Sequence, residues 1–295
     1  MRVAITGSSG LIGTALRAAL AARGDQVVRV LRSHAGPNDV LWDIDAGTID
    51  ATALEGIDAV VHLAGEGIGE KKWSPEQKKV LLESRTKGTS LIATTIAGLT
   101  DRPAVFLSGS AMGFYGNRGT EELSEASAVG SGFLPDLVAA WEDAAQPAIN
   151  AGIRTAFLRT ALVLSADGGA LAEQLPFFRL GIGGKAGDGT QCLSWISIDD
   201  HVRAMLHIID SDLSGPVNLS APNPVTNAEF AKSLGQALRR PTILPTPRLA
   251  IYARLGKEAG DALVYESANV VPTALLDSGF KFEHPVIDSA FAALL

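Results

Sequence analysis

The chain has 295 residues, of which 46% are hydrophobic and 19% charged, and its net charge is −7 at pH 7. This composition supports a large packed core. The acidic balance and the lack of a Lys/Arg cluster argue against a nucleic-acid partner and against docking on an anionic membrane. Cys192 is the single cysteine, which excludes an internal disulfide. With no signal peptide and no apolar run of about 18 residues, the sequence predicts a cytoplasmic protein without a membrane partner.

The first half of the chain alternates short apolar strands with helical segments. We expect strands at Arg2–Ile5, Gln26–Leu31, Ala59–Leu63, Ala104–Ser108 and Thr155–Leu158, and helices at Thr14–Arg23, Pro75–Ala97 and Leu134–Ala151. The strands are continuous apolar runs, which is typical of a parallel sheet buried on both faces. The alternation therefore predicts an α/β fold with a doubly wound parallel sheet.

The pattern changes after Arg159. A glycine-rich loop at Gly181–Gly189 precedes a strand at Trp195–Ile198, and Asp199 or Asp200 is expected to cap a helix that ends near Asp210. Further helices are expected at Asn227–Leu238 and Leu249–Leu255. We interpret residues 1–165 with about 192–220 as a dinucleotide-binding domain. About 166–191 with 221–295 would form a smaller C-terminal lobe that covers the substrate.

Three glycines lie between the first strand and the first helix, at Gly7, Gly10 and Gly13. The first permits a sharp turn, the second lets the backbone approach a pyrophosphate, and the third allows close packing of the helix on the sheet. The free N–H groups at the helix N-terminus favour an anion. The turn thus predicts a dinucleotide site that also includes Ser9, Leu11 and Ile12; the alternative is a tight turn without a ligand. No Lys-Ser/Thr follows the glycines, which excludes a Walker loop.

The second strand ends in Leu31-Arg32-Ser33. NAD usually requires an acidic residue at this place to bind the ribose 2′-hydroxyl, and none is present. Arg32 can instead pair with a 2′-phosphate, which predicts NADP (NADPH) as the cofactor, with Ser33 beside it. The alternative is a solvated arginine at a strand end.

Together these residues resemble the extended short-chain dehydrogenase/reductase superfamily, of the nucleotide-sugar epimerase type. More narrowly the chain resembles the atypical branch labelled "epimerase family protein" within the NAD-dependent epimerase/dehydratase superfamily. The resemblance rests on the glycine turn, Asp58–Gly65 (DAVVHLAG) and Ser110–Gly116 (SAMGFYG). It continues nearly end to end through Gly65-Glu66, Lys72-Trp73, Ser84-Arg85, Trp141-Glu142, Gly168–Ala170, Gln191, Ser194–Ile196 and Ala221–Val225.

The resemblance implies an NADP-binding Rossmann domain with a small substrate lobe. It places further cofactor contacts at Leu63, Ala64, Gly65, Asp43, Arg85, Ser108 and Arg159. The substrate-pocket residues that it implies are Glu66, Ser110, Tyr115, Trp141, Gln191 and Trp195. Simpler alternatives remain for several of these: Arg85 as a surface ion-pair residue, Asp43 as a turn residue, and Trp141 and Trp195 as core residues.

The superfamily's chemistry depends on a Tyr-x-x-x-Lys pair, which this chain lacks. The Tyr is the acid/base, and the Lys lowers the pKa of that Tyr and holds the nicotinamide ribose. The family pattern puts Leu137 and Trp141 at these two places, and neither can transfer a proton. Ser110, Tyr115 and Glu142 are the remaining candidates for a catalytic acid or base. For Tyr115 we favour a packing role, and for Glu142 a supporting or surface role.

Three functions stay open at this point. The chain is an NADP-dependent oxidoreductase or epimerase with a different acid, an NADP(H)-binding sensor or scaffold without catalysis, or an enzyme whose substrate needs no strong acid. The expected substrate is a small molecule, either a nucleotide sugar or a carbonyl compound, and a homodimer is left open. No metal site is expected, because His201 and His207 are six residues apart and do not share a helix face.

Overall fold

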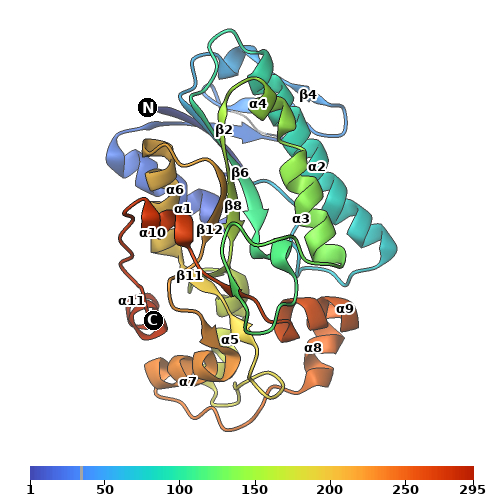
Figure 1. Ribbon diagram of the computed structural model, residues 1–295, viewed down its shortest axis with the longest axis vertical. Coiled ribbons are helices and arrows are strands. Elements are labelled where there is room, and N and C mark those ends of the chain that lie inside the picture. Colours follow the sequence, from blue (N-terminus) through green and yellow to red (C-terminus); the bar gives the residue numbers. More distant parts are fainter. Residues whose placement is uncertain (34–35) are drawn as a thin grey trace.

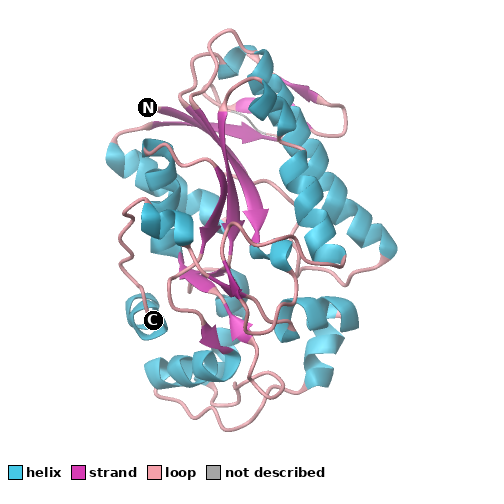
Figure 2. Cartoon of the chain, in the orientation of Figure 1, coloured by secondary structure: helices cyan, strands magenta, loops and turns pink. Residues whose placement is uncertain are grey.

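The computed structural model describes residues 1–33 and 36–295, and a large twisted sheet runs through its centre (Figures 1 and 2). The sheet has eight strands in the order β12-β8-β6-β5-β1-β2-β3-β4. All neighbours pair in parallel except β3 and β4. The strands are β1 (Arg2–Thr6), β2 (Gln26–Leu31), β3 (Val40–Asp43), β4 (Thr48–Ile49), β5 (Ala59–His62), β6 (Val105–Ala111), β8 (Arg154–Thr160) and β12 (Gly215–Leu219). This confirms the predicted doubly wound Rossmann-type α/β fold.

Helices cover both faces of this sheet (Figure 1). On one face, α1 (Leu11–Arg23), α6 (Ile198–Asp210) and α10 (Thr273–Asp277) bury an aliphatic core around Leu16, Leu20 and Met205. On the other face, α2 (Pro75–Gly98), α3 (Phe133–Asp143) and α4 (Gln146–Asn150) cover a second core that includes Ile92. Because both faces are covered, the central strands are apolar on both sides, as the sequence pattern predicted.

The strand order reverses at β1, because β2 and β3 are added on one side of β1 and β5, β6 and β8 on the other. In doubly wound sheets, ligands bind in the crevice at the carboxyl ends of the strands where this reversal occurs. The residues that follow β1, β2 and β5 are therefore the candidates for a ligand site.

Two local predictions need correction. We expected Asp199 or Asp200 to cap α6, but Ser197 is the N-cap and its hydroxyl accepts the Asp200 backbone N–H at 3.1 Å. Ser197 leaves an extended strand at this point, and a hydroxyl is among the best N-caps. The single helix expected over Leu134–Ala151 is two helices, α3 and α4, because the chain turns at Ala144 and Ala145, before Pro147.

A third core lies below the large sheet in Figure 1. It is built by α5 (Gly169–Arg179), α7 (Asn227–Leu238) and α11 (Ile287–Leu294) with the short strands β9 (Leu162–Leu164) and β11 (Trp195–Ser197). Trp195 is fully buried there, and its indole N–H donates to the Asn223 carbonyl at 3.1 Å. Leu275 and Phe280, although close to the C-terminus, pack instead in the core beneath α1 and α6.

Helices α8 (Arg248–Leu255) and α9 (Lys257–Gly260) lie below the lower end of α3 in Figure 1, and η3 (Asp261–Tyr265) follows α9 along the chain. Two further strand pairs are β10 (Cys192–Leu193) with β13 (Val225–Thr226) and β14 (Asn269–Val270) with β7 (Glu122–Leu123). Arg254 joins α8 to the loop after β5 by donating to the carbonyls of Gly69 and Glu70. Among the described residues, no helix is long and apolar enough to cross a membrane.

Candidate functional site: the dinucleotide crevice

The glycine turn after β1 fits tightly against the next strand. Gly7 has φ +65°, and a Cβ there would lie 2.8 Å from the carbonyl carbon of Leu63. A Cβ on Gly13 would lie 2.3 Å from the Gly7 carbonyl oxygen. Both glycines are thus required by the close approach of backbone segments.

Gly10 differs from the other two glycines of the turn. A Cβ there would come no closer than 3.4 Å to a protein atom, its φ of −73° suits any residue, and the glycine is exposed. Gly10 is also the N-cap of α1 and has no side chain to bond the N–H groups of the first turn. The packing of the protein itself therefore does not require glycine here. The close approach of an anion to these N–H groups would require it, because a side chain at this position would stand in the way.

Arg32 and Ser33 are exposed just beyond the end of β2. Arg29, three residues earlier, forms an ion pair with Asp39. Arg32 lies near enough to Glu66 to act on it: the pKa of the Glu66 carboxyl is lowered mainly by its bond to Lys71 and to a smaller degree by the Arg32 charge. A positive side chain thus stands at the place where a 2′-phosphate is expected.

This geometry yields a first prediction. Arg32→Asp should weaken NADPH binding by about ten- to hundredfold, because a hydrogen bond to a charged group contributes about 1.5–3 kcal/mol. NADH binding should change little, since NADH has no 2′-phosphate. Titration of both nucleotides measures this, with Arg240→Asp, at an exposed residue beyond the end of α7, as the control. Equal losses for NADPH and NADH would refute the role of Arg32.

The three candidates for a catalytic acid or base meet in one buried network. Ser110 at the end of β6 donates its hydroxyl to Glu142 of α3 at 2.6 Å. Arg159 of β8 holds the same carboxylate through two bonds of 2.9 Å and donates to the Tyr115 hydroxyl at 3.0 Å. That hydroxyl donates in turn to Asn218 of β12 at 2.7 Å.

Charge in this network is well compensated. Burial opposes the charge of Arg159, but the bonds and the negative charge of Glu142 outweigh burial, so the pKa of Arg159 is raised. Burial raises the pKa of the Tyr115 hydroxyl, which is fully enclosed. The packing role that we favoured for Tyr115 fits this burial, whereas Ser110, Glu142 and Arg159 retain some exposure.

The two places where the superfamily has Tyr and Lys are occupied by apolar packing. Leu137 belongs to a small buried cluster with Leu81 and Val138. Trp141 covers Gly109, whose Cβ would lie 2.7 Å from the indole ring, and its N–H donates to the Thr89 hydroxyl at 3.0 Å. The two places of the superfamily's catalytic pair are thus used for packing and for one hydrogen bond between side chains.

Arg85 of α2 lies above Trp141. Its guanidinium carbon is 5.0 Å from the indole centroid, and its side chain passes within 3.5–3.8 Å of the position that a Cβ on Gly65 would take. The side chain is buried and not at the surface, so the surface ion-pair alternative for Arg85 is wrong. Its buried position beside the end of β5 keeps it within the expected crevice.

Other predicted site residues have local structural partners. Asp43 accepts the backbone N–H groups of Asp45 and Ala46 at 3.0 and 2.9 Å, as a turn residue does. Gln191 donates to the carbonyls of Ala186 and Val264. Ser108 is the exception: it is buried in β6, and its hydroxyl has no partner among the described residues. Cofactor or substrate contacts for these residues remain predictions.

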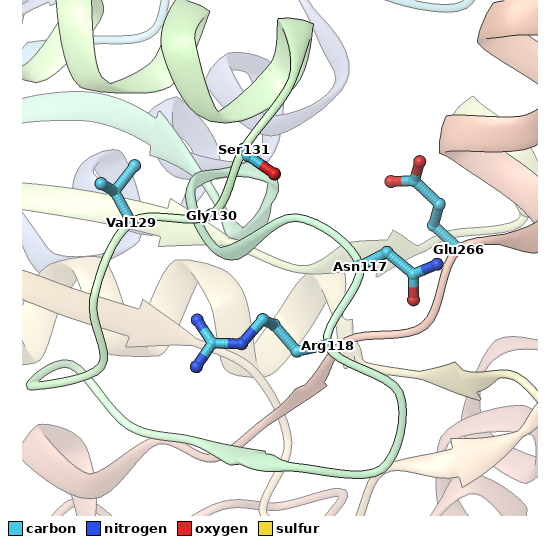
Figure 3. Close-up of a pocket in the computed structure, with 6 residues that line it drawn as sticks. All are labelled: Asn117, Arg118, Val129, Gly130, Ser131 and Glu266. Carbon is cyan, nitrogen blue, oxygen red and sulfur yellow. The ribbon is translucent and has the colours of Figure 1, made fainter.

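A pair of cavities lies between the start of α3 and the segment around η3, and the sequence did not predict it. The first has a volume of about 350 Å³ and the second about 390 Å³, and both are lined by Ser131 and Glu266. Figure 3 shows Ser131 on the segment that leads into α3, with Asn117 and Glu266 on separate segments. Burial raises the pKa of the Glu266 carboxyl. Polar residues in loops leave no periodic pattern, so no sequence signal marked them.

The reversal of strand order at β1, the glycine turn and the exposed Gly10 define an α/β protein of the dinucleotide-binding, Rossmann-like class. The sequence model of the NAD dependent epimerase/dehydratase family matches residues 3–133, and a domain of unknown function (DUF1731) matches residues 246–294. Epimerase family protein Mb2239 of Mycobacterium bovis is 41% identical over 290 residues, covering 98% of this chain and 95% of that protein. The chain therefore belongs to this epimerase family, as its sequence motifs indicated.

Solved structures agree with this assignment. The crystal structure of human epimerase family protein SDR39U1 (isoform 2) with NADPH is 33% identical, with a TM-score of 0.91, covering 100% of this chain and 99% of that one. UDP-glucose 4-epimerase from Thermotoga maritima, solved with UDP-glucose, is 17% identical with a TM-score of 0.76, covering 100% and 97%. At that identity the likeness concerns the fold alone.

Proposed function

We propose that this chain binds NADP(H) in the crevice above β1, β2 and β5 and acts as an NADP-dependent oxidoreductase or nucleotide-sugar epimerase-type enzyme. The observation that carries the proposal is Gly10, a glycine that the protein's own packing does not require, at the N-terminus of α1. Arg32 supports NADP over NAD, and the human relative solved with NADPH supports the same choice.

The proposed cofactor contacts follow the crevice. The turn from Gly7 to Gly13 would hold the pyrophosphate, with Arg32 and Ser33 at the 2′-phosphate. Leu63, Ala64 and Gly65 would line the path along the end of β5. The bound cofactor would supply a hydride in its reduced form or accept one in its oxidised form. The chain's residues would bind the cofactor, orient the substrate and transfer the proton.

Ser110 is the residue that we propose for contact with the reacting group of the substrate. Its hydroxyl proton is directed to Glu142, so the remaining lone pairs of Oγ can accept a proton from a substrate hydroxyl. As that proton arrives, the Ser110 proton would pass to the Glu142 carboxylate. In the reduction of a carbonyl the same proton transfers would run in reverse, from Glu142 through Ser110 to the substrate oxygen. Arg159 would keep Glu142 oriented through the two bonds that it donates.

The covering part of the chain, about 166–191 with 221–295, is proposed as the substrate lobe. The cavities that Ser131 and Glu266 share are the places where we expect the distal part of a substrate. The substrate class stays a nucleotide sugar or a carbonyl compound, and the proposed location is cytoplasmic.

A second candidate function is an NADP(H)-binding sensor or scaffold without catalysis. It is favoured by Leu137 and Trp141, which occupy the places of the catalytic pair with groups that transfer no proton. In this reading the network around Arg159 only stabilises the fold.

A binding and turnover experiment tests the proposal. The unsubstituted protein should bind NADPH and oxidise it with at least one member of a panel of carbonyl compounds and nucleotide sugars. Gly10→Ala should fold with an unchanged melting temperature but bind NADPH about ten- to hundredfold more weakly, since a methyl group forced into a packed contact costs about 1–3 kcal/mol.

Three results separate the alternatives. Tight NADPH binding with no turnover across the panel supports the sensor function. Unchanged NADPH affinity in Gly10→Ala contradicts the placement of the pyrophosphate. Absence of NADPH binding by the unsubstituted protein overturns the proposal as a whole.

A further inference from the structure

The segment that joins α7 to α8 runs along the lower edge of the molecule in Figure 1, and several of its large apolar side chains are exposed. Ile243 is 85% exposed and Leu249 is 80% exposed. The end of α5 is similar, because Leu180 is 74% exposed although Leu175 and Phe178 of the same helix are buried. We call the following six residues, each more than half exposed, the apolar pole: Phe177, Leu180, Ile182, Ile243, Leu244 and Leu249.

Backbone contacts join the two segments that carry the apolar pole. The Thr246 backbone N–H donates to the Lys185 carbonyl at 2.8 Å, and the Thr246 hydroxyl donates to the Gly184 carbonyl at 2.9 Å. A Cβ on Gly184 would lie 2.0 Å from the Leu244 carbonyl oxygen, so only glycine permits this close approach. The six apolar side chains therefore lie on adjoining segments, and a continuous exposed apolar area marks an interaction site.

Positive charge surrounds the apolar pole although the chain as a whole is acidic. Residues 177–188 and 239–249 contain five basic residues and one acidic residue, whereas the net charge of the chain is −7. Arg179, Arg239 and Arg240 are exposed, and no carboxylate of the described residues is within ion-pair distance of them. The sequence showed no Lys/Arg cluster because these residues lie in separate stretches, which the fold brings together.

Charge and shape together indicate the kind of partner. A second copy docked through the same surface would bring the unpaired arginines of two molecules together. The core of a protein interface is closely packed, whereas side chains that protrude as far as Ile243 and Leu249 can enter a fluid layer without a matching surface. Anionic lipids attract basic side chains, and apolar side chains beside them strengthen the binding by the area that they bury.

We propose that the apolar pole docks this protein reversibly on an anionic lipid surface. Its six side chains enter the boundary between the headgroups and the acyl chains, and Arg179, Arg239 and Arg240 contact lipid phosphates. The proposal differs from the sequence-based prediction that there is no membrane partner, and it does not depend on the proposed cofactor function.

Sedimentation with lipid vesicles tests the proposal. The probes are vesicles of phosphatidylcholine alone and of phosphatidylcholine with about one third phosphatidylglycerol. The full chain should bind the anionic vesicles at least about tenfold more tightly than the neutral ones, because each basic residue near the surface adds attraction. Raising the salt concentration from about 0.1 M to about 1 M should remove most of this difference, since the added ions screen the charges.

Two double variants separate the apolar contribution from the electrostatic one. Ile243→Ser with Leu249→Ser should weaken binding to the anionic vesicles by about ten- to hundredfold, because two large apolar side chains are lost. Arg239→Gln with Arg240→Gln should weaken the same binding by about thirtyfold and leave binding to neutral vesicles unchanged. All four side chains are exposed, so the melting temperature should stay the same.

Val80→Ser and Lys281→Gln are the matched controls, since both residues are exposed and lie outside the apolar pole. Neither control should change binding to either kind of vesicle. The proposal is overturned if the unsubstituted protein does not bind the anionic vesicles, if it binds both kinds equally, or if the controls lose as much binding as the double variants. Self-association in solution that Ile243→Ser with Leu249→Ser abolishes, without vesicle binding, would assign the apolar pole to a second copy of the chain.

Discussion

Replacing Glu142 with alanine should lower the free energy of unfolding by about 3–5 kcal/mol, the cost of leaving one member of a buried ion pair without its partner. The side chains of Arg159 and Glu142 are only 5% and 11% exposed. Without the carboxylate, the Arg159 guanidinium stays buried and the Ser110 hydroxyl loses its acceptor at the same time. Urea denaturation at pH 7 measures the change.

Two further variants make this expectation specific. Glu121→Ala removes an exposed partner of Arg118 and should change stability by no more than about 1 kcal/mol. The double variant Glu142→Leu with Arg159→Met should be less destabilised than Glu142→Ala, because apolar side chains of similar volume avoid the unpaired charge. If the single and double variants are equally destabilised, the pair contributes through packing and not through charge.

The fold was largely predictable from the sequence because its signals are local. Buried parallel strands are continuous apolar runs, and the glycine turn lies within seven consecutive residues at a strand–helix junction. Gly13 is fixed by a backbone contact with Gly7 in this same turn, whereas the approach of Gly7 to Leu63 is a tertiary contact between β1 and β5.

The sequence identified several residues of the network around Arg159 as candidates, but it could not predict that they contact one another. Ser110, Glu142 and Tyr115 were each candidates, yet their contacts span 17 to 103 residues and depend on the register of β6, β8 and β12. Asn218 was missed entirely, since one amide inside an apolar strand carries no distinguishing pattern. The stacking of Arg85 on Trp141 likewise depends on how α2 packs against α3.

Acidification should destabilise the protein well above the pH at which its carboxylates titrate. His62 and His201 are fully buried, and burial lowers the pKa of each imidazole from 6.5 to about 3. Between these pH values the unfolded chain binds protons that the folded chain does not, so stability is complete above about pH 6.5 and falls as the pH is lowered. Each histidine should reduce the folding equilibrium constant about tenfold per pH unit, and both together about a hundredfold.

The contacts of the two histidines explain why neither can hold a proton in the folded state. His62 bonds to Thr6 and touches the rings of Trp42 and Phe106, and His201 bonds to Thr160, so no acidic group stabilises the charged form. Urea denaturation at pH 7, 6 and 5 measures the slope before the carboxyl groups begin to contribute. His201→Gln, which keeps a polar group for Thr160, should halve the slope between pH 6 and 5. An unchanged slope would show that His201 takes up its proton without unfolding.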